Sequence, residues 1–347
     1  MKKVKVLIVD DSAVVRSILS SNLRKFEDIE VVGTASNPYE ARNMIVELKP
    51  DVITLDIEMP RMNGLEFISV LMKSYPLPII VISSLVSGKC ETSLHALELG
   101  AVDIFAKPAN DISGAFPLII EELHQKIIYA SFAKVGNSIL EKPKNEKNIE
   151  VLSNIKSSEK VIAIGASTGG TEALKRVLEK LPQNMPPVII TQHMPAGFTK
   201  SFADRLNNIC KNIEVREAVD SEKLHSGLAL VAPGNFHLLL ARDGAKFKVI
   251  VKDGPKICHQ RPAVDVMFLS TAEIAGKNAV GVILTGMGSD GANGLLAMKK
   301  KGAVTISQSE RTCVVYGMPR EAYLKGAVDF VADLDDIPGK IIQALNN

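Results

Sequence analysis

Hydrophobic and polar positions alternate in two distinct ways along the first 130 residues. Short runs rich in valine and isoleucine, such as VKVLIV and PIIVIS, are followed by segments with apolar residues at helical spacing. In YEARNMIVEL, for example, Ala41, Met44, Ile45 and Leu48 fall on one face of a helix. Because strands and helices alternate, the pattern predicts βαβ units and a five-stranded parallel sheet.

The second half of the chain returns to this pattern after a polar interruption. The segment from Ala133 to Lys160 is rich in Lys, Asn, Ser and Glu and has weak periodicity, which is typical of a linker. Buried strands are expected again in VIAIG, PPVIIT and AVGVILTG. The stretch LALVAPGNFHLLLARDGAKFKVIVKDG predicts two or three strands joined by Pro-Gly and Asp-Gly turns, an antiparallel hairpin signal.

We therefore predict an α/β protein of two domains, the second doubly wound with an added hairpin. The expected boundaries are residues 1–125 and 160–347, with a linker at 126–159. A length of 347 residues fits two domains of about 100–200 residues each.

The composition argues against several classes of protein. The 41 basic and 39 acidic residues give a formal net charge of +2, which argues against non-specific nucleic-acid binding. The four cysteines form no C-x-x-C pair and are too scattered for a disulfide framework. No signal peptide is expected, and no apolar stretch approaches the roughly 20 residues of a membrane-spanning helix. We expect a cytoplasmic protein without membrane insertion.

Polar residues end the strands predicted in the first half. Asp10 and Asp11 follow the first strand, and Asp56, Ser83 and Lys107 end three others. Each alone could be a polar strand cap. Together they should meet in one crevice, because the carboxyl ends of parallel strands share one edge of a sheet. Carboxylates there can bind Mg²⁺. A carboxylate beside a lysine is a plausible phosphoryl acceptor, with hydroxyl and lysine contacting the phosphoryl oxygens.

The segments VDDS, LDIEMPRMNGLEF, ISS and AKP resemble the receiver domain of two-component response regulators, over about residues 1–125. The resemblance implies a flavodoxin-like fold and phosphorylation of Asp56 by a histidine kinase. It also implies that Asp10, Asp11 and Asp56 bind Mg²⁺, while Ser83 and Lys107 contact the phosphoryl group.

The chain departs from the receiver pattern at one position. Many receivers carry an aromatic switch residue three positions before the lysine, where this chain has Ile104. Phe105 lies on the opposite face of the same strand. An aromatic-rotamer switch is therefore not expected to transmit phosphorylation in this chain.

The glycine-rich turn GASTGG ends the first strand of the second half. It lacks the Gly-Lys pair of a P-loop and the G-x-G-x-x-G spacing of a dinucleotide site, although helix-start N–H groups could still bind an anion. It does match G-x-S-x-G between a strand and a helix, which would expose the Ser167 hydroxyl. From the pattern alone, a purely structural tight turn is an equally good interpretation.

Two further strand ends supply partners for this serine. His193 follows the strand VIIT, and Asp290 follows VGVILTG. A serine, a histidine and an aspartate from three strand ends meet the requirement of a catalytic triad. Their order differs from the Ser, Asp, His order of α/β-hydrolases, so we expect a different fold with the same geometry.

Other polar residues compete for a role in this site. His237 lies within the predicted hairpin, where a structural role is favoured. His259 and Arg261 belong to a polar cluster with Asp265 that could line the site. Cys258 is not expected to be the nucleophile, because no nearby feature lowers the pKa of its thiol.

The segments IGASTGGTEAL, VIITQHMPAGFTKSFADRLN, APGNFH, RPAVDVMF and GVILTGMGSDGANGLLAMKKKGA resemble the catalytic domain of the CheB family of chemotaxis protein-glutamate methylesterases. With the receiver, the resemblance covers nearly the whole chain apart from the linker. It implies Ser167 as nucleophile, His193 as general base and Asp290 as orienting acid. It also places the Met287 backbone and the turn around Thr168 near the oxyanion.

The family resemblance implies a phosphorylation-activated serine hydrolase that demethylates glutamate methyl esters on chemoreceptors, releases methanol and deamidates certain glutamines. Mg²⁺ is expected only in the receiver, and no cofactor for ester hydrolysis. The implied partners are methyl-accepting chemoreceptors and a chemotaxis histidine kinase. We expect the receiver partly to cover the active site until Asp56 is phosphorylated.

Two alternatives of other classes stay open at this stage. One is a response regulator that acts only by binding, although the chain shows no basic recognition helix for DNA. The other is a sheet-based module that binds an anionic ligand at the turn from Gly165 to Gly170.

Overall fold

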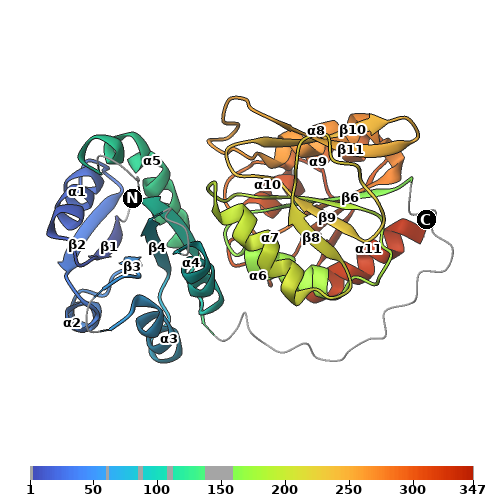
Figure 1. The fold of residues 1–347 in the computed structure, drawn as a ribbon. Coiled ribbons are helices and arrows are strands. Elements are labelled where there is room, and N and C mark those ends of the chain that lie inside the picture. The colour runs from blue at the N-terminus through green and yellow to red at the C-terminus, as the bar shows by residue number, and fades with distance from the viewer. Residues whose placement is uncertain (1–2, 60–61, 85–88, 108–111, 137–158, 347) are drawn as a thin grey trace. The chain divides into compact units, whose positions relative to one another are not determined.

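A computed structural model describes residues 3–59, 62–84, 89–107, 112–136 and 159–346 (Figure 1). The chain divides into two compact units, Met1–Glu141 and Lys142–Asn347. Most of the expected linker, residues 137–158, lies outside the described residues. Its expected first part, residues 126–130, instead forms the last turns of helix α5 (Ile112–Ala130). Helix α5 thus continues beyond residue 125, the predicted end of the first domain, to Ala130.

The N-terminal unit contains the expected five-stranded parallel sheet, in the order β2-β1-β3-β4-β5. Both faces of the central strands are buried, which explains why they are nearly continuous apolar runs. The strands are β1 (Val4–Val9), β2 (Ile29–Ala35), β3 (Val52–Asp56), β4 (Ile79–Ser84) and β5 (Asp103–Lys107). The helices before α5 are α1 (Ala13–Leu23), α2 (Pro38–Leu48), α3 (Gly64–Ser74) and α4 (Lys89–Glu98).

Helix α2 shows how local sequence produces these elements. Asn37 caps it by accepting hydrogen bonds from the N–H groups of Tyr39 and Glu40, and Pro38 occupies the first turn. Ala41 and Ile45 are buried on the face that the spacing predicts. The cap and the apolar stripe together fix where the helix begins and which side packs on the sheet.

The C-terminal unit is built on a seven-stranded parallel sheet in the order β14-β13-β12-β6-β7-β9-β8. From β6 the chain adds β7, β8 and β9 on one side, and it later adds β12, β13 and β14 on the other side, so the strand order reverses between β6 and β12. Such a switch point leaves a crevice at the carboxyl ends of the strands. The strands are β6 (Val161–Ala166), β7 (Val188–Gln192), β8 (Glu214–Glu217), β9 (Leu228–Val231), β12 (Ala279–Ile283), β13 (Val304–Gln308) and β14 (Phe330–Ala332).

The antiparallel hairpin is confirmed, but it is shorter than the sequence pattern predicted. Strands β10 (His237–Asp243) and β11 (Lys246–Lys252) pair around the Asp-Gly turn. The preceding LALV segment is β9, which pairs in parallel with β7 in the main sheet. Of the two or three strands that the pattern allowed, the hairpin contains two, and this segment is not one of them. All four residues of β9 are buried, whereas in β10 and β11 buried residues alternate over part of each strand with partly buried ones.

Helices cover both faces of this sheet, and α8 lies against both α9 and β10 (Figure 1). Strand β6 approaches α8 closely, since a Cβ atom at Gly165 would fall 2.2 Å from Cγ1 of Val264. The helices are α6 (Gly170–Glu179), α7 (Phe198–Ile209), α8 (Val264–Ile274), α9 (Ala292–Lys300), α10 (Met318–Leu324) and α11 (Ile337–Asn346), with 3₁₀ turns at Gly276–Asn278 and Leu334–Asp336. Among the described residues, none of the helices has the length and apolar character needed to span a membrane.

Candidate active site

Ser167 follows β6 at the switch point, in a turn that neighbouring strand ends hold in place. Its N–H donates to the carbonyl of Thr285 at 3.1 Å. Its carbonyl accepts the Gly170 N–H at 2.7 Å and Nε2 of Gln192 at 2.9 Å. The turn is therefore tied to the last residue of β7 and to the segment that follows β12, so the serine keeps a fixed position relative to both.

The glycines of the turn are explained by close packing. Gly169 has a φ of +77°, and a Cβ atom there would lie 2.6 Å from the side chain of Val314. A Cβ atom at Gly170 would lie 2.2 Å from Oε1 of Gln192. Gly286 packs on the serine itself, because its Cβ would lie 2.7 Å from Cβ of Ser167. These positions require glycine whether or not an anion binds.

His193 and Asp290 form a buried pair beside this turn. Nε2 of His193 lies 2.8 Å from Oδ2 of Asp290, and both side chains are at most 4% exposed. An ionised carboxylate only accepts hydrogen bonds, so Nε2 carries the proton in this pair. Nδ1 is buried and has no hydrogen-bond partner among the described residues. It is the ring atom left with a lone pair to accept a proton.

Asp290 is held by the N-terminus of α8. The N–H of Val264 donates to Oδ2 at 2.7 Å, and the N–H of Asp265 donates to Oδ1 at 2.9 Å. Both groups belong to the first turn of the helix, whose N–H groups have no partner within the helix. The helix dipole also favours a negative charge there. This end of α8 thus fixes the plane of the carboxylate that faces His193.

Two turns lie where an oxyanion is expected. Gly286 uses its carbonyl to accept the N–H groups of Gly317 and Met318. The N–H of the next residue, Met287, has no acceptor among the described residues. The carbonyl of Thr168 accepts a hydrogen bond from Oγ1 of Thr285, which links the two turns. The backbone around Met287 thus has an available donor beside the serine turn.

His237 serves the fold of this region. Nε2 of its ring lies 2.9 Å from the carbonyl of Pro255, and Nδ1 accepts the N–H of Ala263 at 3.2 Å. Both nitrogens are therefore occupied in holding the loop that leads into α8. This leaves His237 no atom for proton transfer.

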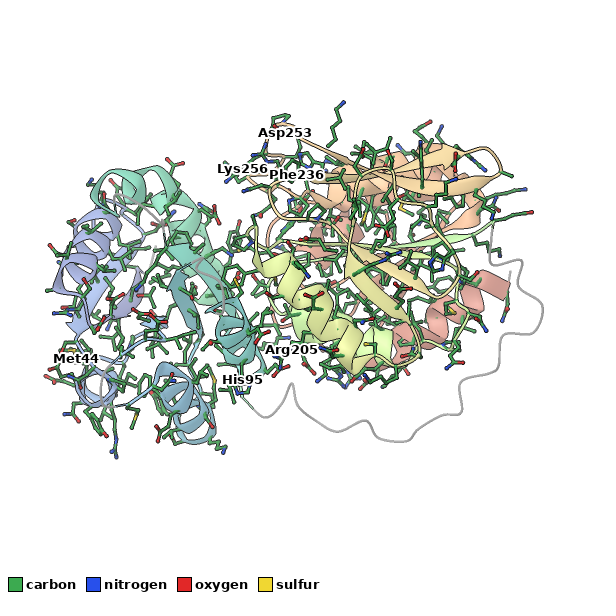
Figure 2. All side chains as sticks on the ribbon, viewed as in Figure 1. Met44, His95, Arg205, Phe236, Asp253 and Lys256 are labelled. Atoms are coloured by element: carbon green, nitrogen blue, oxygen red, sulfur yellow. The ribbon has the colours of Figure 1, made fainter. Side chains whose placement is uncertain are left out.

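The loop before α8 carries the remaining candidates. Nη1 of Arg261 donates to Asp253 and to the carbonyl of Gly254, and its Nε is buried without a partner among the described residues. His259 is exposed in the same loop. Asp253 and Lys256, which belong to the same loop, are labelled in Figure 2. Arg261 and His259 thus lie in the loop before α8, and within the described parts of the chain no hydrogen bond joins either side chain to Ser167.

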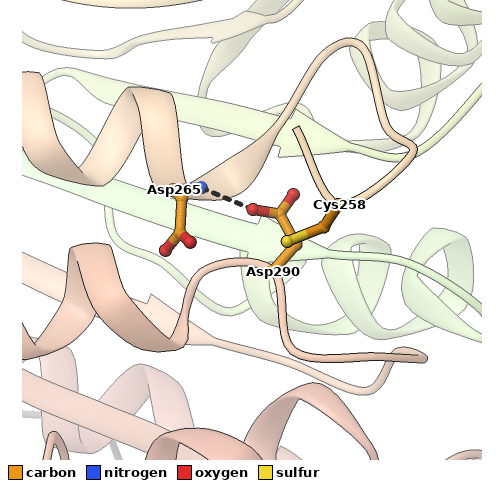
Figure 3. A group of neighbouring side chains, drawn as sticks. All are labelled: Cys258, Asp265 and Asp290. Carbon is orange, nitrogen blue, oxygen red and sulfur yellow. Dashed lines mark hydrogen bonds between the residues drawn. The ribbon is translucent and has the colours of Figure 1, made fainter. Parts of the chain in front are cut away.

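Cys258 lies close to the acidic residues of the site (Figure 3). Its Sγ and carboxylate oxygens of Asp265 and Asp290 lie within 4.8 Å of one another. Burial, with the charges of these two carboxylates, raises the pKa of the Cys258 thiol. The carboxylate oxygens already accept N–H groups. The group therefore shows neither an activated nucleophile nor a free set of metal ligands.

The N-terminal unit brings together its own cluster. Nζ of Lys107 lies 2.6 Å from Oδ2 of Asp56 and 2.8 Å from Oδ2 of Asp10. Oxygens of Asp10, Asp11 and Asp56 lie within 4.8 Å of one another, a donor set that suits a hard cation such as Mg²⁺. Burial raises the pKa of Asp56, against the opposing charge of Lys107. Ser83 is buried at the end of the neighbouring strand, β4.

The position of the receiver switch residue is filled by an aliphatic side chain. Ile104 and Phe105 are both buried, and they pair with Val81 and Ile82 of β4. Burial of both side chains leaves no exposed aromatic ring on this part of β5.

Some features of the site were not predicted from the sequence. The N–H groups of Val264 and Asp265 carry no side-chain signature. One signal was available: Ala263 occupies the N-cap position of α8, where it has no side chain to cap the helix. A helix start without a capping residue indicates that the cap comes from elsewhere in the fold.

The class of protein is a response-regulator receiver joined to a hydrolase domain, in which Ser167, His193 and Asp290 are the candidate catalytic residues. The CheB methylesterase family matches residues 162–341, and the response regulator receiver domain matches residues 6–113. The chain belongs to the CheB methylesterase family.

Its relatives match over their full length. It is 53% identical to protein-glutamate methylesterase/protein-glutamine glutaminase 2 of Syntrophus aciditrophicus, over 99% of each chain. It is 48% identical to the Salmonella typhimurium protein of the same type, over 100% of this chain and 98% of the relative. The crystal structure of the Thermotoga maritima CheB methylesterase catalytic domain is 41% identical, with a TM-score of 0.52, over 54% of this chain and 98% of that domain.

An activated serine in this geometry should react with an organophosphonate. We expect covalent labelling on the peptide that contains Ser167, because Nδ1 of His193 accepts the hydroxyl proton during attack. Replacing His193 by Ala should slow labelling by about 10²–10⁴-fold, the usual size of general-base catalysis. His237→Ala is the matched control and should react at a rate near that of the unmodified chain if folded. Labelling at another residue would contradict the assignment.

Proposed function

We propose that the chain is a protein-glutamate methylesterase that also deamidates certain glutamines, with chemoreceptors as substrates. The observation that carries the proposal is the buried 2.8 Å pair of His193 and Asp290 beside the Ser167 turn. The names of relatives that match over the whole chain supply the substrate class. In this proposal, residues 1–125 are the receiver, 126–159 the linker and 160–347 the catalytic domain.

The first half of the reaction forms an acyl-enzyme. Oγ of Ser167 attacks the side-chain carbonyl of the methyl ester while Nδ1 of His193 takes the hydroxyl proton. The negative charge on the carbonyl oxygen is stabilised by backbone N–H groups at Met287 and around Thr168. When the tetrahedral intermediate collapses, His193 returns the proton to the departing oxygen and methanol leaves. Asp290 stabilises the imidazolium that exists between these two transfers.

The second half regenerates the serine. Water attacks the acyl carbonyl, His193 takes a proton from the water, and the protonated histidine returns it to Oγ of Ser167. The product is a free glutamate side chain. A glutamine amide passes through the same kind of tetrahedral intermediate and releases ammonia, so one site accounts for both activities. No step requires a cofactor in the hydrolase site.

The receiver supplies the regulation. A chemotaxis histidine kinase is the proposed phosphodonor and Asp56 the acceptor. Asp10, Asp11 and Asp56 would hold Mg²⁺, which when bound would neutralise phosphoryl charge. Lys107 already contacts Asp56, and it is placed to pair with the phosphoryl oxygens together with Ser83. We propose that the unphosphorylated receiver partly covers the hydrolase site and that phosphorylation releases it.

Methanol release from membranes that carry methylated chemoreceptors tests the activity. The unmodified chain should release methanol, and Ser167→Ala should lower the rate by about 10⁶-fold, which is complete loss in practice, since the attacking oxygen is gone. Cys258→Ala is the control, because the thiol has no role in the mechanism. Undiminished turnover by the Ser167 variant would refute the nucleophile. Receptor binding without turnover by the unmodified chain would favour a response regulator that acts only by binding.

The same assay tests the regulation. Adding Mg²⁺ and a small-molecule phosphodonor should raise the rate of the full chain, and Asp56→Asn should remove the increase without changing the basal rate. A fragment that begins near Lys160 should exceed the rate of the unphosphorylated full chain, because it lacks the cover. A fragment no faster than the full chain would exclude covering as the mechanism, whereas a response of Asp56→Asn to phosphodonor would exclude Asp56 as the acceptor.

A further inference from the structure

The N-termini of α8 and α9 are each capped by an aspartate that lies at the start of the other helix. Asp290 lies just before α9, and its carboxylate accepts two N–H groups of the first turn of α8. Asp265 lies in that turn of α8, and its Oδ1 accepts the Gly294 N–H of α9 at 2.7 Å. Its Oδ2 accepts Nδ2 of Asn293 at 3.3 Å. Each helix thus supplies the acidic cap of the other, and neither has a capping bond from its own N-cap side chain.

Asp265 is the residue that joins the two caps. Its carboxylate is bound to α9, and its own N–H is one of the two groups that hold Asp290. A continuous path runs from Gly294 through Asp265 and Asp290 to His193. The helices have little room to shift there, because a Cβ atom at Gly294 would fall 2.5 Å from Cβ of Phe268.

Burial at this position disfavours the charged form of a carboxylate. Burial raises the pKa of Asp265, and the charge of Asp290 raises it further, while the Gly294 N–H opposes both effects. An apolar residue would serve helix packing without this desolvation. The hydrogen bonds that Asp265 accepts account for an acid at this position.

We propose that Asp265 is a positioning residue for the hydrolase site, which holds the first turn of α8 so that Asp290 keeps the His193 imidazole aimed at Ser167. The inference rests on the proposed esterase function. Without this link, the Val264 and Asp265 N–H groups move relative to Asp290, and the imidazole loses its orientation. Loss of this orientation should lower kcat and leave KM unchanged, because Asp265 acts through Asp290 and not on the substrate.

A swap of Asp265 and Asn293 isolates this role. In Asp265→Asn, one oxygen remains to accept the Gly294 N–H, but the new amide N–H₂ faces Nδ2 of Asn293. In Asn293→Asp, two carboxylates face each other. The double variant restores a donor opposite an acceptor, and Lys325, whose Nζ lies 2.7 Å from Oδ1 of Asn293, then meets a carboxylate. We expect each single change to lower kcat about tenfold with KM unchanged, since small misplacements of catalytic groups have effects of this order. The double variant should recover most of the loss.

Ser270→Ala is the matched control for general loosening of α8. Oγ of Ser270 accepts the Leu240 N–H at 3.0 Å, away from the Asp290 carboxylate. The full chain is assayed with phosphodonor and Mg²⁺ below the melting temperature of every variant, and alkylation of the exposed Cys258 reports on the local fold. The control should keep its kcat even where its melting temperature falls.

The outcomes separate this inference from the esterase proposal. Wild-type kcat in both single variants would overturn the role of Asp265, as would an equal loss in Ser270→Ala or failure of the double variant to recover. If Asp265→Asn does not fold, Asn293→Asp and the double variant carry the same comparison. A chain that releases no methanol even with Ser167 and Asp265 unchanged would instead refute the esterase itself.

Discussion

The hydrolase site depends on the two N–H groups at the start of α8 that hold the Asp290 carboxylate. A buried carboxylate needs such donors, because desolvation otherwise disfavours its charge. Once held, it fixes which nitrogen of His193 carries the proton. In the proposed mechanism, the remaining nitrogen accepts the proton of Ser167. The orientation of the whole site therefore follows from where one helix begins.

The chain uses the carboxyl ends of parallel strands twice. In the N-terminal unit, Asp10, Asp56 and Lys107 come from three strand ends and form a charged cluster. In the C-terminal unit, Ser167, His193 and Asp290 follow β6, β7 and β12 and are buried, and a hydrogen bond joins His193 to Asp290. Both sites use the same edge of an open sheet. Their chemistry differs because one assembles carboxylates around a cation and the other isolates a single acid–base pair.

The strand ends are also the part of the site that sequence could predict. Polar residues at or after the ends of apolar runs stood out at Asp56, Ser167, His193 and Asp290, and their shared edge follows from parallel pairing. The α8 amides could not be predicted this way, because backbone groups leave no sequence pattern. The sequence left open whether β9 joins the hairpin, because turn residues follow it, whereas pairing with β7 decides its place. Composition also does not show where α5 ends, which is at Ala130, inside the segment predicted as linker.

A crystal structure of the chain with Ser167 phosphonylated tests this account most directly. It should show Nδ1 of His193 within about 2.6–3.2 Å of Oγ of Ser167 or of a phosphonyl oxygen, the reach of a hydrogen bond. Asp290 should still accept the N–H groups of Val264 and Asp265 while it binds Nε2. An imidazole turned so that Nε2 faces the serine, or an Asp290 carboxylate released from α8, would contradict the account.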